Sequence, residues 1–415
     1  MFSLNVLQSI RLDVRQTVKT RKCSVNMLPI QLTHTGYWYA AMFPEVSISQ
    51  KLASLSNEAG FSVSGIARVP SPDSPEHFRD LERYEQWIAD GASGEMEYLQ
   101  RRNDSGALLR SSLRHVFPWA RSVIVCAANY NPHPSVPLSV DQTEPGHGWI
   151  ASYAITSRQE PDGSVAPSDY HRVLLKRLER VADGLQVHCG PLQSRTFVDT
   201  GPVVERLFAR YAGVGWTGKN TCTLNEKLGS WLFLGVIVMS LELEAQEHIS
   251  LAEDRCGSCR RCIEACPTNA LTPYQMDARL CISYLTIEKR GLIPLDLRQK
   301  VGRQVFGCDI CQEVCPWNRR APIAVDDQLA PRRELVNPAL DWLGEMREED
   351  FNRVFNGSPV RRAKFSGFRR NVAIAMGNSG LRRFLPILEE WAAAGDEVLA
   401  ETAQWAISQI FMSHK

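Results

Sequence analysis

Eight of the twelve cysteines in this chain fall between Cys256 and Cys315, and their spacing constrains the fold more than any other feature. The first four follow the pattern CxxCxxCxxxCP and end at Cys266. An isolated Cys281 comes next, and the pattern CxxCxxxCP closes the segment. Disulfide frameworks are typical of small secreted domains, whereas this chain has 415 residues and no clear secretory signal. The spacing therefore indicates thiolates that bind metal.

In bacterial proteins with two iron–sulfur clusters, three close thiolates of such a run bind one 4Fe–4S cluster and the fourth reaches the other. By this reciprocity we predict that the first cluster is bound by Cys256, Cys259, Cys262 and Cys315. The second cluster is predicted to be bound by Cys266, Cys281, Cys308 and Cys311. Zinc also takes four thiolates, but its sites usually combine two separate CxxC pairs. We therefore predict two 4Fe–4S clusters that relay single electrons to another centre.

The composition, with a net charge of +1 and 44% hydrophobic residues, describes an ordinary soluble protein. No run of 18 or more apolar residues occurs, so no segment is expected to span a membrane. Residues 1–47 are basic without clear periodicity, as in a transit peptide, but they lack the Arg-Arg pair of a twin-arginine export signal. We interpret them as a poorly ordered extension, or as residues upstream of a later start at Met27 or Met42. We expect a cytoplasmic protein.

Residues 48–245 alternate helical and strand patterns, which predicts an α/β (α+β) domain. Apolar and β-branched stretches predict buried strands at 61–69, 122–130 and 231–240, and amphipathic spacing predicts helices at 48–60, 76–101, 169–185 and 204–216. The Pro- and Gly-rich residues 131–168 are predicted to be loop. A strand within 194–203 runs into a tight turn at Asp199, and ligands of α/β domains lie beyond the carboxyl ends of strands.

Residues 246–330 are the predicted ferredoxin-like cluster domain, and residues 331–415 are a predicted all-α domain that is helical from Pro359 to its end. Small residues at the helix contacts are typical of a helical-repeat unit. The stretch 361–383 has no acidic residue and carries Arg361, Arg362, Lys364, Arg369, Arg370, Arg382 and Arg383. Clusters of basic residues usually lie on solvated surfaces. Because no acidic residue opposes the charge of this one, it also suits contacts with the phosphates of a nucleic acid.

Three further stretches carry a resemblance: VDTGPVVER at 198–206, GVGWTGKNT at 213–221 and RRNVAIAMGN at 369–378. Taken with the cysteines, they resemble signatures of the epoxyqueuosine reductases, which are cobalamin-dependent iron–sulfur enzymes of tRNA modification. They stand in the family's order around the cluster segment. The combination is specific, although each motif alone is weak, and the resemblance covers roughly residues 48–415.

The resemblance implies an α/β domain that holds base-off cobalamin, a ferredoxin-like domain with both clusters, and an all-α HEAT-like domain that grips tRNA. The implied reaction removes the epoxide oxygen of epoxyqueuosine at the wobble position, the last step of queuosine biosynthesis. Cobalt reduced through the clusters can supply the low-potential electrons. The implied partners are a tRNA with a queuosine-type anticodon and a low-potential electron donor such as flavodoxin or ferredoxin, and the enzyme is expected to be a monomer.

The departing oxygen needs a proton, and the family's proton donor matches Asp199. Burial among apolar neighbours would raise the pKa of this carboxyl; the alternative is an Asp that only caps the turn at 200–202. A substrate or phosphate contact is implied for Arg206. Cobalamin contacts are implied for Arg110, Asp199, Trp216, Gly218, Lys219 and Asn220. Contacts with tRNA are implied for Arg361, Arg362, Arg369 and Arg370.

Other residues leave alternatives open. His171 begins a helix, where a structural role is as plausible as a functional one. Ser152 stands where the family commonly carries an arginine, which leaves one wall of the cofactor pocket undefined. Cys23, Cys126, Cys189 and Cys222 have no ligand spacing and are expected to be buried thiols.

A cobalamin-dependent reductive dehalogenase-like reductase of a small molecule is the main alternative function, because it would use the same cofactors. Such proteins generally carry a twin-arginine signal and lack a basic helical C-terminal domain, and this chain has the opposite features. A simple electron carrier would leave 198–206 and 213–221 unexplained, and cobalamin binding would exclude an RNA-binding protein with a structural metal. We therefore predict an epoxyqueuosine reductase.

Overall fold

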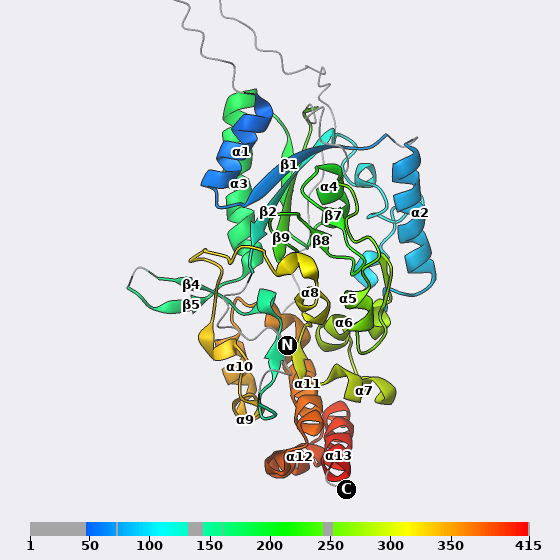
Figure 1. The fold of residues 1–415 in the computed structure, drawn as a ribbon, viewed down its shortest axis with the longest axis vertical. Coiled ribbons are helices and arrows are strands. Elements are labelled where there is room, and N and C mark those ends of the chain that lie inside the picture. The colour runs from blue at the N-terminus through cyan, green and yellow to red at the C-terminus, as the bar shows by residue number, and fades with distance from the viewer. Residues whose placement is uncertain (1–46, 72–73, 132–143, 161, 244–251, 414–415) are drawn as a thin grey trace, which may run out of the picture. The chain divides into compact units, whose positions relative to one another are not determined.

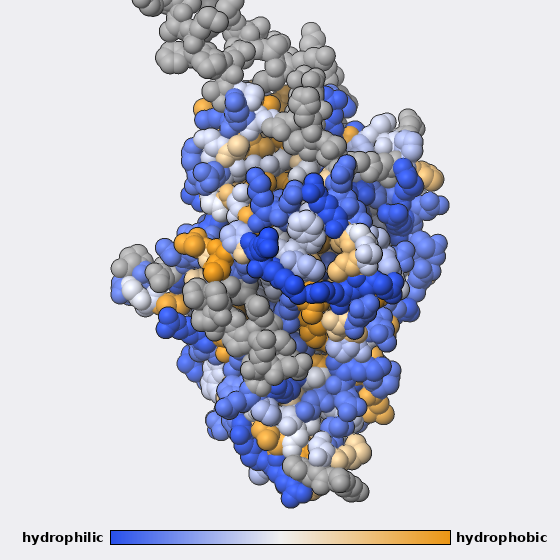
Figure 2. Space-filling model, viewed as in Figure 1, coloured by the Kyte–Doolittle hydropathy of each residue, from blue (hydrophilic) through white to orange (hydrophobic). Residues whose placement is uncertain are grey.

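Figure 1 draws the computed structural model, which describes residues 47–413 except for 72–73, 132–143, 161 and 244–251. The described residues belong to one compact unit. The predicted basic extension, apart from Ser47, lies outside them. No helix within the described ranges has the length and apolar content needed to cross a membrane. Figure 2 shows hydrophilic residues over most of the face that it draws, with apolar residues in small groups.

A four-stranded sheet forms the centre of the predicted α/β (α+β) domain. Its order is β1 (Val63–Arg68), β2 (Ser122–Asn129), β9 (Leu232–Met239) and β6 (Ser194–Phe197), and each neighbouring pair is antiparallel. The two central strands, β2 and β9, are the apolar stretches that the sequence predicted to be buried. The antiparallel pairing selects the α+β form, so the carboxyl ends of the strands do not meet at one edge.

Helices cover both faces of this sheet (Figure 1). On one face, α1 (Ile48–Glu58) and α3 (Tyr170–Cys189) pack together against side chains such as that of Ile124. On the other face, α4 (Glu205–Tyr211) packs against the intervening side chains such as that of Val123. Successive side chains of a strand point to opposite faces, so both apolar sets are buried, each side chain contributing about 1.5–3 kcal/mol. Apolar packing on both faces thus stabilises the sheet from which the loops extend.

Two predicted features flank this sheet. The predicted helical region 76–101 begins as α2 (Pro75–Ala89), which ends before Gly91. The segment GVGWTGKNT supplies β7 (Trp216–Thr217) and the turn of a tight hairpin, whose second strand is β8 (Thr223–Leu224). The predicted helix over 204–216 was therefore too long, because α4 ends at Tyr211 and Trp216 lies in a strand.

The prediction that residues 131–168 form a loop was wrong for the part that the structure describes. Residues 132–143 and 161 lie outside the described residues. The segment contains three short strands: β3 (Trp149–Ile150), β4 (Thr156–Gln159) and β5 (Val165–Pro167). β3 pairs in parallel with β12 (Gln304–Phe306), and β4 pairs with β13 (Ala330–Pro331) as well as with β5. Because β12 and β13 lie far along the chain, local composition does not reveal this pairing.

The cysteine segment folds into short helices and one hairpin: α5 (Arg261–Glu264), β10 (Leu271–Thr272), β11 (Gln275–Met276), α6 (Ile282–Ile287), α7 (Leu295–Val301) and α8 (Ile310–Glu313). α5 and α8 each carry a cysteine of one run, and the two helices contact each other. α6 begins directly after Cys281, which is its N-cap residue. This packing brings the two cysteine runs together.

The chain beyond residue 331 is mostly helical, as predicted: α9 (Leu340–Glu345), α10 (Glu348–Val354), α11 (Lys364–Ser379), α12 (Leu385–Ala392) and α13 (Glu397–Met412). α11 contacts α13, α9, α7 and β12, so it is buried along much of its length. Gly377 lets α11 approach α13 closely, because an added Cβ would lie 2.8 Å from the Cα of Ala406. The small residues at helix contacts thus have the packing role that the sequence predicted.

One apolar core crosses the borders of the three predicted domains. It combines Ile150 from the first, Val305 and Phe306 from the second, and side chains of α9 to α13 from the third. The predicted domain borders at residues 245 and 330 therefore do not mark the edges of separate apolar cores. The division into three domains stays a prediction.

Candidate active site

The thiols of the cysteine segment lie in two groups. In the first, Cys262 has Cys256 and Cys259 as electrostatic neighbours, and Cys315 has Cys256 and Cys262. In the second, Cys281 neighbours Cys266, Cys308 neighbours Cys281, and Cys311 neighbours both Cys308 and Cys281. None of the eight forms a disulfide. Cys222 is a further neighbour of Cys311 and of Cys315, so the membership of the two ligand sets stays a prediction.

Zinc and iron–sulfur clusters need different spacings of their thiolates. Zinc draws its thiolates to about 2.3 Å from one point. The thiolates of a 4Fe–4S cluster bind four separate irons, so they lie further apart. Within the part of the chain that the structure describes, no group of three His, Cys, Asp or Glu side chains is placed to hold a single metal ion.

A cavity of about 1190 Å³ opens beside Asp199. Residues of all three predicted domains line it, among them Tyr98, Arg110, Tyr153, Asp199, Phe306 and Arg362. Two lining residues lead to the cysteines: Ile287 ends the helix that begins after Cys281, and Phe306 precedes Cys308 by two residues. The chain segments that carry Cys281 and Cys308 therefore also contribute to the cavity wall.

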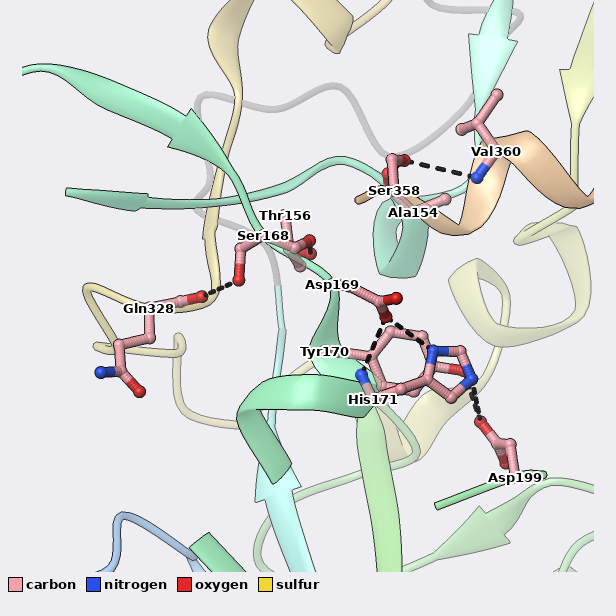
Figure 3. Close-up of polar contacts among 10 residues, drawn as sticks. All are labelled: Ala154, Thr156, Ser168, Asp169, Tyr170, His171, Asp199, Gln328, Ser358 and Val360. Carbon is pink, nitrogen blue, oxygen red and sulfur yellow. Dashed lines mark hydrogen bonds and ion pairs between the residues drawn. The ribbon is translucent and has the colours of Figure 1, made fainter. Parts of the chain in front are cut away.

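Asp199 lies in the turn after β6 with a φ of +55°, a left-handed conformation that Asp tolerates better than most residues. Its Oδ2 accepts a hydrogen bond from the Tyr170 hydroxyl and lies 3.7 Å from Nε2 of His171 (Figure 3). The sequence predicted burial among apolar neighbours, and this was wrong. The side chain is 54% exposed, because the turn carries it from the sheet to the cavity wall.

His171 is held between two carboxylates. Asp169 is the N-cap of α3; its Oδ1 accepts a hydrogen bond from the backbone N–H of His171 at 3.0 Å and lies 2.7 Å from Nδ1 of the same residue. Burial opposes ionisation of Asp169, but the contact with His171 outweighs it and lowers the pKa of this carboxyl. The helix cap thus fixes the imidazole with its other nitrogen toward Asp199 (Figure 3), which favours the functional interpretation of His171.

Glu205 is a buried carboxyl near Asp199 that sequence reasoning missed. It is 8% exposed, and its Oε1 has no hydrogen-bond partner among the described residues. Burial raises the pKa of Glu205 to about 7, and the charge of Asp199 adds to the rise. The neighbouring Arg206 is exposed, has Asp199 among its electrostatic neighbours, and donates to the carbonyl of Thr221 at 3.0 Å. The one signal for Glu205 in the sequence is that its carboxyl group directly follows the apolar residues 202–204.

Two predicted arginines meet at one aromatic ring in the cavity. The guanidinium carbon of Arg110 lies 5.7 Å from the centre of the Tyr98 ring, and that of Arg362 lies 5.2 Å from it. Arg362 also pairs with Glu288 of the cluster segment. The structure therefore brings a predicted cobalamin contact and a predicted tRNA contact to the same wall.

The four remaining predicted cobalamin contacts lie elsewhere. Trp216, Gly218, Lys219 and Asn220 are not among the described residues that line the cavity. Lys219 and Asn220 instead donate hydrogen bonds to carbonyls of the cysteine loops. Their contact with cobalamin stays a prediction, whereas their contact with the cluster loops is observed.

The sequence left the wall of the cofactor pocket at Ser152 undefined, and the structure gives this residue a role. Both its backbone N–H and its hydroxyl donate to Oδ2 of Asp309, at 2.7 and 3.0 Å. Asp309 stands between two cysteines of the second group and is 1% exposed. Ser152 therefore anchors the second cysteine loop rather than lining the cavity.

The predicted basic surface at 361–383 is smaller in the structure than in the sequence. Arg361 and Lys364 are exposed, but Arg383 pairs with Asp341, and Arg369 lies 4.8 Å from the centre of the Trp391 ring. Arg370 is only 2% exposed, so it does not belong to the surface at all. The exposure that the sequence implied for Arg370 is therefore wrong, because the helix that carries it is central.

Arg370 and Asn371 tie α11 to the cluster segment. The Arg370 guanidinium donates to the carbonyls of Leu285, Lys289 and Gly291 at 2.6–2.9 Å. The amide of Asn371 donates to the carbonyls of Thr286 and Val305 at 2.8 and 2.9 Å. The signature RRNVAIAMGN thus supplies buried donors for a loop whose carbonyls would otherwise be unsatisfied.

Arg370→Met is expected to destabilise the protein by about 2–4 kcal/mol, because it leaves several buried carbonyls without a donor. The measurement is denaturant-induced unfolding of the holoprotein. Arg361→Met is the matched control, since Arg361 is exposed, and its change should stay within about 0.5 kcal/mol. Equal stability of the two variants would contradict this role of Arg370.

Family models match two parts of the chain. One, described as a 4Fe-4S double cluster binding domain, matches residues 255–318. The other, described as Epoxyqueuosine reductase QueG, DUF1730, matches residues 110–200. The first range holds all eight cysteines of the two groups, and the second includes Arg110, His171 and Asp199.

Curated relatives and solved structures resemble nearly the whole chain. An epoxyqueuosine reductase of Pseudomonas aeruginosa is 37% identical over 364 residues, covering 87% of this chain and 94% of that protein. The epoxyqueuosine reductase of Escherichia coli K12 is 34% identical, with 87% and 89% covered. A crystal structure of epoxyqueuosine reductase with a tRNA-Tyr epoxyqueuosine-modified stem loop matches with a TM-score of 0.73 at 25% identity, covering 88% and 90%.

Proposed function

The chain belongs to the epoxyqueuosine reductase family, and we propose that it carries out the family's reaction in the cavity beside Asp199. It is an oxidoreductase that reduces epoxyqueuosine to queuosine in tRNA, the last step of queuosine biosynthesis. Its cofactors are two 4Fe–4S clusters, which the matched domain binds, and cobalamin. The location rests on one observation: a single cavity brings together Asp199 and the arginine pair on Tyr98, and its wall includes Phe306, two residues before Cys308.

The cavity suits a cofactor as large as cobalamin. Pockets for drug-sized ligands measure about 300–1,000 Å³, and this one, at about 1190 Å³, is larger. Its wall carries tyrosine hydroxyls and arginine guanidiniums, which can donate to the amide oxygens around a corrin. Arg110 and Asp199 are the predicted contacts on this wall. Cobalamin bound there would supply low-potential electrons at the cavity.

Electrons enter through the first cysteine group and reach the cavity through the second. Residues between the first-group cysteines, such as Gly257 and Arg260, are exposed. The second group surrounds the buried Asp309 and adjoins the cavity through Ile287 and Phe306. A low-potential donor protein such as flavodoxin or ferredoxin would therefore meet the first group.

Removal of an epoxide oxygen as water takes two electrons and two protons. Asp199 gives the first proton, because its carboxyl faces the cavity. His171, whose Nε2 lies 3.7 Å from Asp199, returns a proton to it, and Asp169 holds the imidazole in place. Glu205, with its pKa near 7, is a second carboxyl that holds a proton close to neutrality. The site thus contains groups for both protons.

The tRNA approaches along the exposed basic residues next to the cavity. Arg362 lines the cavity, and Arg361 and Lys364 extend the positive surface outward. Arg206 lies near Asp199 and can contact the modified nucleotide. The protein acts as a monomer in the cytoplasm, where its tRNA substrate is found.

The test is an anaerobic reaction of tRNA carrying epoxyqueuosine with protein that holds both clusters and cobalamin, and with a low-potential reductant. We expect the modified nucleoside to lose the mass of one oxygen, and we expect this loss to require cobalamin. No conversion by fully loaded protein, together with reductive loss of halide from a small halogenated aromatic, would favour the dehalogenase-like alternative instead.

A further inference from the structure

The segment 213–221 lies against both cysteine runs. The ammonium group of Lys219 donates to the carbonyls of Gly257 and Cys259, the second at 3.0 Å. The side-chain amide of Asn220 donates to the carbonyl of Cys311 at 3.3 Å. Two adjacent residues of one turn therefore hold a loop of the first cysteine group and a loop of the second.

The turn itself is closely fixed. The backbone N–H of Gly218 donates to the carbonyl of Cys222 at 2.8 Å, and Thr221 has a φ of +64°. A Cβ at Gly218 would lie 2.2 Å from the end of the Leu224 side chain and 2.8 Å from Oδ1 of Asn220, so a larger residue there would displace both side chains. The hairpin of β7 and β8 thus gives Lys219 and Asn220 one defined starting position, which a cross-tie between two loops requires.

Trp216, from the same segment, reaches a cysteine of the first group. It is 3% exposed and packs edge-to-face on Trp317, with 5.0 Å between ring centres. Its indole N–H is buried without a hydrogen-bond partner among the described residues. The ring packs in one cluster with Cys315 and Cys256 of the first group. An unpartnered N–H therefore lies beside two predicted cluster ligands, where a cluster sulfur would be its acceptor.

We propose that segment 213–221 serves the iron–sulfur clusters: Lys219 and Asn220 tie the two cysteine loops together, and Trp216 raises the reduction potential of the first cluster. Hydrogen bonds to cluster sulfurs stabilise the added electron and are a known determinant of potential. The proposal rests on cluster binding and not on tRNA reduction. It assigns the signature GVGWTGKNT to electron transfer instead of to the cavity.

The first test is Trp216→Phe in protein that carries both clusters, followed by reductive titration with electron paramagnetic resonance. Phenylalanine keeps the aromatic packing and removes the N–H. At a fixed potential, we expect the ratio of oxidised to reduced first cluster to rise about tenfold, which corresponds to a fall of about 59 mV for a one-electron couple. The second cluster should titrate as in the unmodified protein.

Trp317→Phe is the matched control, because it shortens the other indole of the same pair and leaves the N–H of Trp216 in place. An equal shift in both variants would mean that packing or solvent exposure sets the potential, and this would overturn the role of the hydrogen bond. An unchanged titration of Trp216→Phe would overturn it as well.

The second test concerns the tie between the loops. Lys219→Met is expected to speed the loss of iron to a chelator about tenfold, within the range found for residues that support metal ligands. Lys227→Met, an exposed lysine of the same hairpin region, should leave this rate unchanged. Equal rates for the two variants would overturn the tie. Neither test depends on tRNA, so failure of the proposed function would leave both results interpretable.

Discussion

Asp199→Asn is expected to slow epoxide reduction by about a hundredfold to ten-thousandfold, the usual contribution of a positioned acid. The amide has the shape of the carboxyl group but cannot give up a proton to the leaving oxygen. Asparagine also accepts the left-handed backbone at φ +55°, so the turn is retained. The measurement is the single-turnover rate of oxygen loss from the nucleoside, with protein that carries both clusters and cobalamin.

Asp169→Asn is the matched control for this prediction, because it neutralises another carboxylate on the same cavity wall. Asparagine is as good an N-cap as aspartate, so α3 keeps its cap and only the charge that faces His171 is lost. We expect a loss of rate well below that of Asp199→Asn. Equal losses in the two variants, or a normal rate for Asp199→Asn, would contradict the role of Asp199 as proton donor.

Strands β2 and β9 could be predicted from the sequence. Both faces of each strand are buried, so nearly all of their consecutive residues are apolar. The helices of the C-terminal region could be predicted for a similar reason, since small and apolar residues repeat at helical spacing. The strands within 131–168 could not. β3 pairs with β12, and β4 pairs with β13 as well as with β5, and no local pattern records partners as far along the chain as β12 and β13.

The predicted site residues also fall into two classes: those that follow from local spacing and those whose burial depends on the whole fold. Metal ligands repeat at short, fixed intervals, so spacing alone predicts which cysteines bind each cluster. Membership of the family and the reaction, which the motifs predicted, are confirmed by the relatives. Burial is different, because it depends on the whole fold. Arg370 reads as a surface cation in the sequence yet lies inside, whereas Asp199 reads as buried yet faces a cavity.

Glu205 shows why tertiary contacts matter for the chemistry as well. Its sequence neighbours only indicate a helix start, and its raised pKa comes from burial and from Asp199 on another segment. Likewise, the partners of 213–221 are the cysteine loops, which a glycine-rich motif alone does not specify. A motif in the sequence thus identifies the family, and the contacts decide which centre the motif serves.

Cys281→Ala is expected to remove the second cluster and, with it, all turnover. Cys281 is the member of the second group that stands outside both cysteine runs, and its thiol neighbours Cys266. About four of eight iron atoms should remain, with the signal of the first cluster intact. Epoxyqueuosine should stay unreduced, since no relay then adjoins the cavity. Cys189→Ala, which changes a thiol of α3 in neither group, should keep all the iron and the full rate.

Cys222 adds a second test to this prediction, because its thiol is an electrostatic neighbour of that of Cys311. If Cys281→Ala retains both cluster signals, Cys222 is the thiol placed to replace the missing ligand. The double variant Cys281→Ala/Cys222→Ala should then lose the second cluster. Retention of about eight irons in the double variant would contradict the ligand set of the second group. Loss in the single variant would establish that Cys222, despite its closeness, serves only as a neighbour of the cluster.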